Sequence, residues 1–503
     1  MNQSFDVIIV GAGLAGLSAA LAAREEGASV CVLERAPESE RGGNSRFSNG
    51  AMRAVYSGLD EIVDLVGEIS EAERARADFG RYTREEYYDH MGRITQYRTD
   101  PAMCEILVER SSETMHWLRH QGVRFLPLYE WQFKTAEGRI IFSGGSALET
   151  YGAGDGLSSA LFAAAERAGV TVRYETRALS LSRTNGVVDG VKVFARGAGG
   201  GREFVIAAKS VVVAAGGFEA NPEWRTRYLG PGWELAKVRG SRFNTGDGLR
   251  MVLDAGGKPY GNWSGCHSAS WDLNAPDANT LEFGTVFKRD DFANGIMVNA
   301  RGRRFVDEGA DVSALTYAKM GRAILAEPNQ IAWQIYDAKA RPFIHGEYRI
   351  RQAARFQADT IEALAAKLEG LDQAALVDTI KEFNASIPDD IPFDSGKKDG
   401  RTTRGLPLPK SNWARALDTP PFEAWAVTCG ITFTFGGVQI DTTGQVLDVD
   451  DIPIPGLFAA GEMVGGIFYF NYPGGAGLMS ASVFGRLAGM SAAKACASQV
   501  ATR

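Results

Sequence analysis

Three glycines and one acidic residue near the start of the chain have types and a spacing that suit phosphate and ribose chemistry. Residues 11–16 read Gly-Ala-Gly-Leu-Ala-Gly, and Glu34 follows them. Gly11 permits a tight turn, Gly13 lets the backbone approach a pyrophosphate, and Gly16 lets a helix pack closely on a sheet. Glu34 can accept a hydrogen bond from a ribose 2′-hydroxyl, and its charge would repel a 2′-phosphate. Together they predict a dinucleotide site.

Two strands and a helix must position these residues. Residues 5–10, Phe-Asp-Val-Ile-Ile-Val, are apolar and β-branched, which predicts a strand buried on both faces. Residues 17–26 predict a helix whose N-terminus faces the phosphates, and residues 30–33 predict a second strand that ends at Glu34. Glycine-rich turns occur in other α/β proteins, but this order of elements is that of a Rossmann-like fold.

A second glycine-rich polar loop follows, where a nicotinamide-binding domain would continue into another strand and helix. Residues 41–51 read Arg-Gly-Gly-Asn-Ser-Arg-Phe-Ser-Asn-Gly-Ala. At this point the sequence resembles the fumarate reductase/succinate dehydrogenase flavoprotein family, which has a Gly-Gly-Asn-Ser stretch beside its flavin. The resemblance implies FAD, with contacts from Ala15, Glu34, Arg35, Gly43, Asn44, Ser45, Asn49 and Gly50. Members that bind FAD covalently use a histidine in this loop, and residues 1–89 contain none, so we expect non-covalent FAD.

Further stretches match this family in order along nearly the whole chain, and the resemblance implies a cofactor contact in each. They are the strand end 175–178 with Ala178, the crossing 210–217 with Ala215 and Gly216, the Thr-Gly-Asp-Gly motif with Asp247, the strand 455–462 with Glu462, and the turn 474–480 with Gly477 and Leu478. Asp247 could equally be the cap of the helix that begins there.

The pattern predicts an α/β protein, a Rossmann-like FAD-binding domain interrupted by an α+β capping domain. We expect the FAD-binding domain at 1–260 and 431–503, and the capping domain at 261–430. Residues 295–308 predict a strand, a turn and a strand that resemble the mobile cap of the family. Periodicity also predicts helices at 59–78, 102–121, 157–168, 359–368 and 373–386, a hairpin of strands 187–195 and 203–206 with a tip at 197–201, and a loop at 387–406.

The composition excludes several classes of function. The 503 residues carry a formal net charge of −7, which argues against a nucleic-acid surface. No apolar run has the length of a membrane span, and the first strand begins too early for a signal peptide, so we expect a cytoplasmic protein. The scattered cysteines predict reduced thiols: Cys31, Cys104, Cys266, Cys429 and Cys496. His116 and His120 have a helical spacing, but no acidic residue lies between them, and we expect no metal site.

The family transfers a hydride between flavin and carbon, with a proton moving at the adjacent carbon. His267 matches the region of a substrate-binding histidine of the fumarate reductases. Phe433 replaces their second histidine, Tyr472 replaces an arginine, and residues 309–317 lack their proton-relay arginine. These replacements separate the chain from fumarate and succinate chemistry.

Two other groups resemble the chain more closely at these positions. Residues 304–311, 316–319 and 461–475 look like the tricarballylate dehydrogenase group. The Tyr-Pro-Gly turn at 472–474 also resembles 3-ketosteroid Δ1-dehydrogenases, which implies that Tyr472 binds a ketone and that Tyr317 acts as the base. The predicted catalytic residues are therefore Tyr472, His267, Tyr317 and Arg304.

Three functions follow. The leading one is an FAD-dependent dehydrogenase or desaturase acting on the CH–CH group of a small carboxylic acid, as in tricarballylate dehydrogenase. The second is a ketone α,β-dehydrogenase of the 3-ketosteroid Δ1 or oxocyclohexanecarboxylate type. The third is a flavin electron carrier without turnover, which a closable pocket argues against. Since the chain has no CxxCH haem motif, electrons must leave by another molecule, and the resemblance implies a membrane-bound, quinone-linked acceptor protein.

Overall fold

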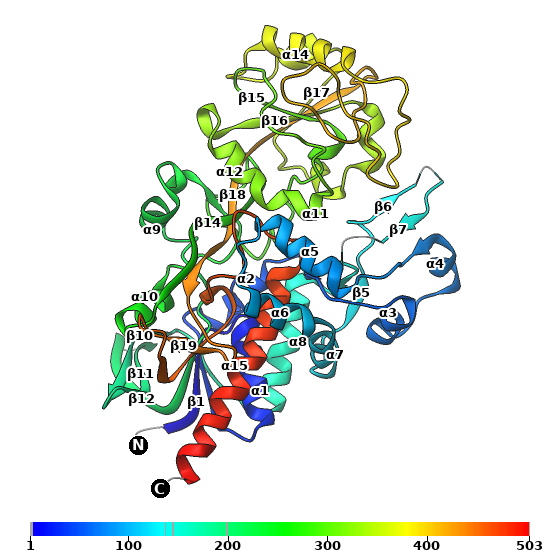
Figure 1. Ribbon diagram of the computed structural model, residues 1–503. Coiled ribbons are helices and arrows are strands. Elements are labelled where there is room, and N and C mark those ends of the chain that lie inside the picture. The colour runs from blue at the N-terminus through cyan, green and yellow to red at the C-terminus, as the bar shows by residue number, and fades with distance from the viewer. Residues whose placement is uncertain (1–3, 136, 143–144, 198–199, 502–503) are drawn as a thin grey trace.

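The computed structural model describes residues 4–135, 137–142, 145–197 and 200–501, and it is elongated (Figure 1). The lower part holds both described ends of the chain around a mostly parallel sheet, and the upper part holds β15 to β17 and α12 to α14. The predicted α/β architecture with an α+β cap is thus confirmed.

The lower sheet is built on the β-branched segments that the sequence predicts. Its strand order is β10-β11-β12-β1-β2-β9, β20 pairs with β12, and β19 pairs with β20. Strand β1 is parallel to both β2 and β12, and its last four residues are buried. The bounds are β1 Ser4–Val10, β2 Val30–Leu33, β9 Thr171–Arg173, β10 Thr176–Thr184, β11 Val187–Gly197, β12 Gly200–Val213, β19 Gln445–Leu447 and β20 Pro453–Ala459.

Strand β12 corrects one expectation. The predicted strand 203–206 and the strand that opens the predicted crossing at 210–217 are parts of one continuous strand, which ends at Val213. Its first half pairs antiparallel with β11, and from Ala207 onward it pairs parallel with β1, so a single backbone serves the hairpin and the core of the sheet. Two residues of the predicted hairpin tip, 198–199, lie outside the described residues.

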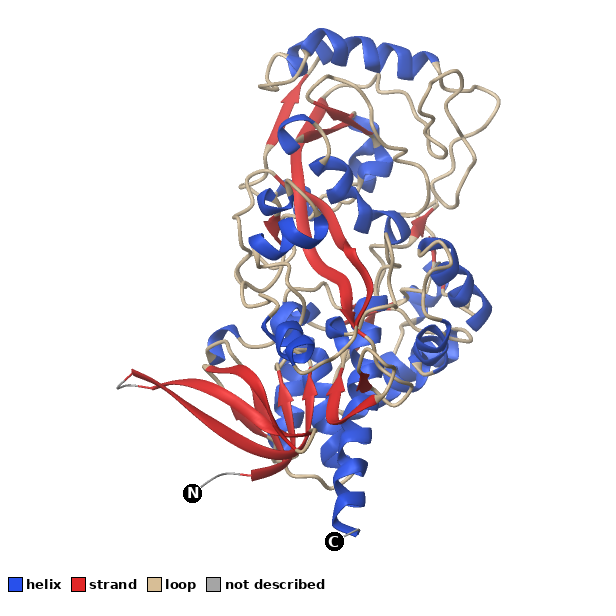
Figure 2. Cartoon of the chain, turned by 60° about the vertical axis from the view of Figure 1, so that its left-hand side comes forward, coloured by secondary structure: helices blue, strands red, loops and turns tan. Residues whose placement is uncertain are grey.

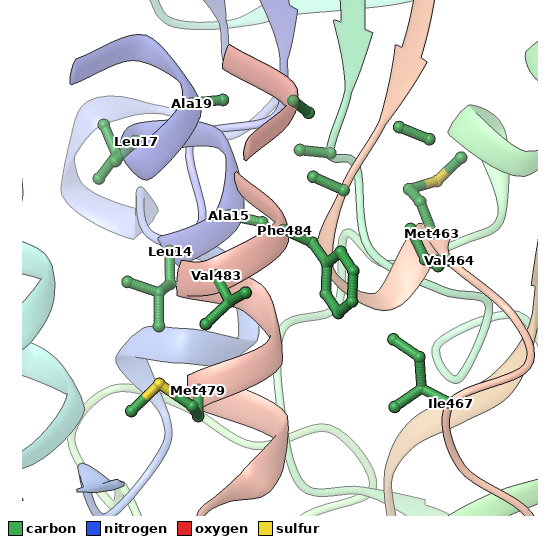
Figure 3. Close-up of a cluster of buried hydrophobic side chains, with 14 of the residues drawn as sticks. Leu14, Ala15, Leu17, Ala19, Met463, Val464, Ile467, Met479, Val483 and Phe484 are labelled. Atoms are coloured by element: carbon green, nitrogen blue, oxygen red, sulfur yellow. The ribbon is translucent and has the colours of Figure 1, made fainter. Parts of the chain in front are cut away.

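Two helices pack against each other beside this sheet, α1 Leu14–Glu25 and α15 Ala476–Ala501. Figure 3 shows their apolar side chains, with Leu14 and Ala15 from α1 and Val483 and Phe484 from α15. The close crossing requires glycine, because a Cβ at Gly485 would lie 2.4 Å from the carbonyl oxygen of Ala15. The N-terminus of α15 is thereby held beside the turn that precedes α1.

The upper sheet has the order β13-β18-β16-β15, and β14 and β17 also pair with β18. Figure 2 shows the two long strands β14 Pro259–Asp272 and β18 Phe422–Val438 passing between the lower and upper parts. The expected domain boundaries at 260 and 430 fall inside these strands, and the division into domains stays a prediction. The other strands are β13 Lys237–Val238, β15 Ile296–Asn299, β16 Ala332–Tyr336 and β17 Arg355–Ala358.

Some helix and strand predictions need correction. The segment 59–78 is split at Gly67, whose φ of 100° ends the first helix, and 102–121 forms two helices that meet at Arg110. The second strand of 295–308 is absent, and a single bridge joins Val298 to Arg304. The remaining helices are α2 Gly43–Arg46, α3 Leu59–Val66, α4 Glu71–Arg76, α5 Arg84–Ile94, α6 Pro101–Glu109, α7 Ser111–His120, α8 Ala153–Arg167, α9 Pro222–Trp224, α10 Asp247–Asp254, α11 Ser313–Thr316, α12 Met320–Leu325, α13 Ile361–Ala365 and α14 Gln373–Ala385. Short strands β3 Ala51–Met52, β5 Phe125–Pro127 and β8 Leu148–Thr150 form one small sheet, and β4 Ala77–Asp78, β6 Phe133–Lys134 and β7 Ile140–Ile141 another.

Candidate active site

A cavity of about 1520 Å³, counted with the open space at its mouth, lies where the glycine-rich loops of the lower part converge. Most of the predicted cofactor residues line it, namely Gly11, Gly13, Ala15, Glu34, Arg35, Gly43, Asn44, Ser45, Ala178, Ala215, Gly216, Asp247, Glu462, Gly477 and Leu478. Gly16, Asn49 and Gly50 are not part of its lining. The tertiary structure therefore gathers segments from both ends of the chain around one elongated site.

The glycines of the first turn separate into two kinds. A Cβ at Gly11 would lie 2.4 Å from the oxygen of Ala214, and one at Gly16 would lie 1.9 Å from the oxygen of Gly11, so protein packing demands both glycines. A Cβ at Gly13 would meet nothing nearer than 3.7 Å. Because Gly13 lines the cavity, its missing side chain leaves room in the cavity itself, as the approach of a pyrophosphate requires.

Glu34 lies where the sequence predicts, at the end of β2, with 7% of its surface exposed. One carboxylate oxygen accepts a hydrogen bond from the amide of Ala12 at 2.9 Å, and the other accepts one from the amide of Ala36 at 2.7 Å. Burial raises the pKa of this carboxyl, and the backbone donors oppose the rise. Glu34 thus holds the glycine turn in shape as well as facing the cavity.

Asp247 is not a helix cap, which corrects that alternative. It is the first residue of α10, the capping position is Gly246, and no side chain caps the helix. Its carboxylate instead pairs with Arg35 at 3.0 Å and with Arg177 at 2.8 Å. These pairs join β2, β10 and α10 at the end of the cavity that Ala178 lines, where the resemblance implies the adenine.

Asn44 connects the second glycine loop to two other segments. Its amide nitrogen donates to Glu219 at 2.5 Å and to the carbonyl of Thr432 at 2.7 Å, and its oxygen accepts from the amide of Ser241. Glu219 is fully buried, and burial together with the charge of Glu462 raises its pKa well above the usual range. No motif pointed to Glu219, because its role depends on contacts from distant parts of the chain.

An aromatic cluster begins at the other end of the cavity, where Tyr472 and Phe433 line it, and continues behind this lining with His267 and Tyr317. The hydroxyls of Tyr317 and Tyr472 are hydrogen-bonded at 2.6 Å. The ring of His267 lies 5.0 Å from the ring of Tyr317 and 4.8 Å from that of Tyr472, and Phe433 contacts both His267 and Tyr472. The structure therefore brings together three of the four predicted catalytic residues.

His267 is 2% exposed, and neither of its ring nitrogens has a hydrogen-bond partner among the described residues. Burial and the positive charge of Arg239 lower its pKa well below the usual value, so the ring is neutral near pH 7. A buried imidazole without partners is costly. Its two nitrogens are therefore available to a ligand in this cluster.

Arg239 is a functional candidate that the sequence did not reveal. Its charge acts on His267, Tyr317 and Tyr472, and its Nη1 atom is buried without a partner among the described residues. Its guanidinium lies 4.8 Å from the ring centre of Trp271. The neighbouring β13 pairs with β18, and this pairing brings Arg239 beside the strand that carries Phe433.

The surroundings of Tyr317 disfavour its ionised form, and its role as the base stays a prediction. Burial and the neighbouring Tyr472 raise the pKa of Tyr317 well above its usual value, and Arg239 opposes this rise without overcoming it. Burial also raises the pKa of Tyr472. Both phenols are therefore neutral near pH 7 and can pass a proton on rather than hold a negative charge.

Two hydrogen bonds between the flanking segments hold the tyrosine pair together. The amide of Gly474 donates to the carbonyl of Ala314 at 2.7 Å, and the side-chain amide of Asn471 donates to the carbonyl of Leu315 at 2.9 Å. The segment that carries Tyr317 is thus fastened to the turn that carries Tyr472.

Arg304 lies apart from this cluster. Its guanidinium pairs with Glu308 at 2.5 Å, donates to the carbonyl of Leu408 and lies over the ring of Phe383. Both side chains of the pair are nearly or fully buried. Its contacts are those of a structural ion pair in the cap, so the structure does not place it with the other three predicted catalytic residues.

Three further observations concern metal ligands, thiols and membrane spans. Within the described ranges, no group of three or more acidic, histidine or cysteine side chains could hold a metal ion. The five cysteines are free and buried. Among the residues that the structure describes, no helix is long and apolar enough to cross a membrane.

Comparison with known proteins is consistent with this site. The family described as "FAD binding domain" matches residues 6–478. A probable fumarate reductase, Ifc3, of Shewanella frigidimarina is 30% identical over 505 residues, covering 98% of this chain and 75% of that protein. The open conformation of a flavocytochrome c3 fumarate reductase superposes with a TM-score of 0.71 at 28% identity, over 98% of this chain and 79% of that one. A 3-ketosteroid Δ1-dehydrogenase of Sterolibacterium denitrificans shares the fold, with a TM-score of 0.74 at 21% identity, over 99% of this chain and 100% of that one.

Proposed function

Because the chain belongs to the FAD binding domain family and is an FAD-dependent oxidoreductase of CH–CH bonds, we propose that it acts on a small acid whose reacting bond lies next to a carboxylate. Such a substrate needs an anion site close to the flavin and a group that moves a proton. The observation that carries the proposal is the buried cluster of His267, Tyr317 and Tyr472, of which Tyr472 lines the cofactor cavity. The third possibility, an electron carrier without turnover, is set aside because the chain is an enzyme.

FAD, when bound, supplies the acceptor or donor of the hydride. The chain itself must bind and orient the substrate and move the proton. The single N–H of the neutral His267 ring and the Nη1 atom of Arg239 are donors that a carboxylate would satisfy. The tyrosine pair supplies the proton path, because its two hydroxyls are already hydrogen-bonded to each other. The phenyl rings of Phe433 and Phe468 beside Tyr472 exclude water from the reacting bond.

The charge of Arg239 favours an acid over a neutral substrate. An arginine fork binds a carboxylate through two parallel hydrogen bonds, and the Nη1 atom of Arg239 is buried without a partner among the described residues. Tricarballylate is the first compound to try, since residues 461–475 resemble the tricarballylate dehydrogenase group. The FAD is proposed to be non-covalent.

A ketone α,β-dehydrogenase is the second candidate, and the pair of tyrosine hydroxyls favours it. Two phenol donors can polarise a ketone oxygen without a cationic partner. In that case Tyr472 would bind the ketone, and Arg239 would only adjust the electrostatics of the cluster. A cyclic ketone rather than an acid would then be the substrate.

The reduced enzyme is proposed to pass its electrons to a separate, quinone-linked protein in the cytoplasm or at the membrane. Only one complete dinucleotide fingerprint occurs in the sequence, and FAD uses it, so NAD is not the expected acceptor.

An anaerobic titration tests these proposals. The oxidised flavin absorbance is followed while tricarballylate, other small di- and tricarboxylates, or a cyclic 3- or 4-ketone is added. Bleaching by an acid supports the first proposal, and bleaching by the ketone alone supports the second. The Arg239→Gln variant separates them further, because it should weaken bleaching by an acid much more than bleaching by a ketone. Equal behaviour of wild type and variant with an acid would remove Arg239 from the proposal.

A further inference from the structure

A second cavity lies on the far side of the tyrosine pair. Tyr472 lines the cofactor cavity, whereas Tyr317 lines a separate cavity of about 980 Å³, counted with open space. Because the two hydroxyls are bonded at 2.6 Å, the pair spans the wall between the two spaces. A proton that enters the pair on the cofactor side can therefore leave it on the other side.

Asp290 is a buried carboxyl that lines this second cavity. It lines the cavity with Tyr317, is 6% exposed, and its Oδ1 atom is buried without a hydrogen-bond partner among the described residues. The hydroxyl of Ser313, one helical turn before Tyr317, donates to the backbone carbonyl of Asp290 at 3.0 Å. This contact holds Asp290 against the segment that carries Tyr317.

We propose that Asp290 is the group that exchanges protons with the Tyr472–Tyr317 pair and passes them to the second cavity. The inference rests on the proposed function, and it replaces the proton-relay arginine that residues 309–317 lack. Asp290 acts through Tyr317 and does not touch the substrate.

The proton balance during dehydrogenation is simple. One C–H bond of the substrate breaks and its proton binds the Tyr472 oxygen, while the Tyr472 O–H bond breaks and its proton binds the Tyr317 oxygen. The O–H bond of Tyr317 breaks in turn, and its proton binds the Asp290 carboxylate. FAD, when bound, would accept the hydride from the adjacent carbon and with it both electrons. The neutral Asp290 carboxyl then returns its proton to water in the second cavity. Reduction of a double bond runs the same transfers backwards.

The charges around Asp290 suit this exchange. Burial raises the pKa of Asp290 to about 6, Lys288 and Arg239 oppose the rise, and Asp291 and Glu347 add to it. His345 also lines the cavity, but its imidazole is engaged by Asp291 at 2.6 Å. A carboxyl that titrates near neutral pH can both accept and return a proton.

The test compares Asp290→Asn with wild type across a pH series, using the compound that bleaches the flavin. In wild type, kcat/KM for dehydrogenation should fall below pH 6, because the carboxyl must be ionised to accept the proton. In Asp290→Asn this acidic limb should disappear, and the plateau rate should drop by about 10²-fold while FAD stays bound. Asp290→Glu should restore part of the rate, and formate should restore part of it in Asp290→Ala.

Glu149 provides the matched control. Burial and the nearby Glu130 raise the pKa of Glu149 to about 7, and Lys288 opposes them, but Glu149 does not line the second cavity. Glu149→Gln should keep both the rate and the acidic limb. Loss of the limb in Glu149→Gln, or its survival in Asp290→Asn, would overturn the proposal.

A measurement without substrate separates this proposal from the proposed function. The infrared carbonyl band of a protonated carboxylic acid is recorded in wild type and in Asp290→Asn on either side of pH 6. Asp290→Asn should lose one band that titrates there, and an unchanged spectrum would overturn the assignment. If no compound bleaches the flavin, the proposed function fails, whatever the infrared result.

Discussion

Replacing Tyr472 by phenylalanine removes one hydroxyl and keeps the ring that packs against Phe433, Phe468 and His267. The lost hydroxyl bonds Tyr317 at 2.6 Å, and both residues are at most 7% exposed. The variant leaves the Tyr317 hydroxyl buried without that partner, which should cost about 1–3 kcal/mol of stability. Turnover should fall by about 10²–10³-fold, as when one preorganised transition-state donor is lost.

The assay follows the anaerobic reduction of the flavin by stopped-flow absorbance, and thermal unfolding is measured in parallel. Tyr336→Phe is a matched control. Tyr336 is fully buried in the upper part, and its hydroxyl donates to Gln334 at 2.9 Å, but it does not line the cofactor cavity. It should lose a similar amount of stability and keep its turnover. Full activity of Tyr472→Phe would refute the catalytic role and leave the side chain as packing.

A double-mutant cycle then shows whether the two tyrosines act as one unit. If the proton passes through both, Tyr317→Phe alone should be about as slow as Tyr472→Phe, and the double variant should be little slower than either. Independent roles would instead multiply the two rate losses. Multiplied losses would contradict the path through both hydroxyls even if each single variant is slow.

Three further predictions concern the cofactor cavity and the cap. Gly13→Ala should fold normally, because the nearest atom to its new Cβ would be 3.7 Å away and its φ is −77°, but it should retain little FAD. Gly11→Ala should unfold at a lower temperature, because its Cβ would lie 2.4 Å from the carbonyl oxygen of Ala214. FAD content and melting temperature check both predictions. Glu34→Ala removes the acceptor of two buried amides and should weaken FAD binding by about 1–3 kcal/mol. The rate of FAD release measures this loss, and unchanged retention would place Glu34 outside the site. Burial lowers the pKa of His345, but its hydrogen bond to Asp291, the charge of Asp291 and the carbonyl of Glu130 together outweigh burial and raise the pKa from 6.5 to about 9. His345 should therefore contribute up to about 3 kcal/mol of stability that is complete below pH 6.5 and lost as pH rises through 9. The unfolding free energies of wild type and His345→Gln should converge above that pH, and a constant difference would contradict the pairing.

The cofactor half of the molecule was largely predictable from the sequence. Gly11, Gly13 and Glu34 line the cavity as expected, because a strand, a tight turn and a helix form from residues next to one another in the chain. The same holds for the final turn and helix, where Gly477 and Leu478 meet the cavity. Gly16 is needed for packing rather than for contact with the cavity, as its predicted role required.

The candidate catalytic residues could be identified only through the family resemblance, and not all of them lie together in the structure. The resemblance indicated His267, Tyr317 and Tyr472, and the structure places the three together. It also indicated Arg304, whose guanidinium is instead bound by Glu308. The sequence did not reveal this pair, because it does not tell which way a side chain near a turn points.

The sequence by itself determined the FAD site, since the backbone conformations that cradle a dinucleotide depend on glycines and apolar runs that are local. Only the tertiary structure decided the surroundings of the reacting bond. Arg239 meets His267 through the pairing of β13 and β14 with opposite edges of β18, and a register shift between His267 and Ser268 changes which side chains share a face. Asp290 and Tyr317 come to line one cavity only in the tertiary structure. Strand register and the direction of each side chain depend on long-range pairing, and no local pattern of residues carries that information.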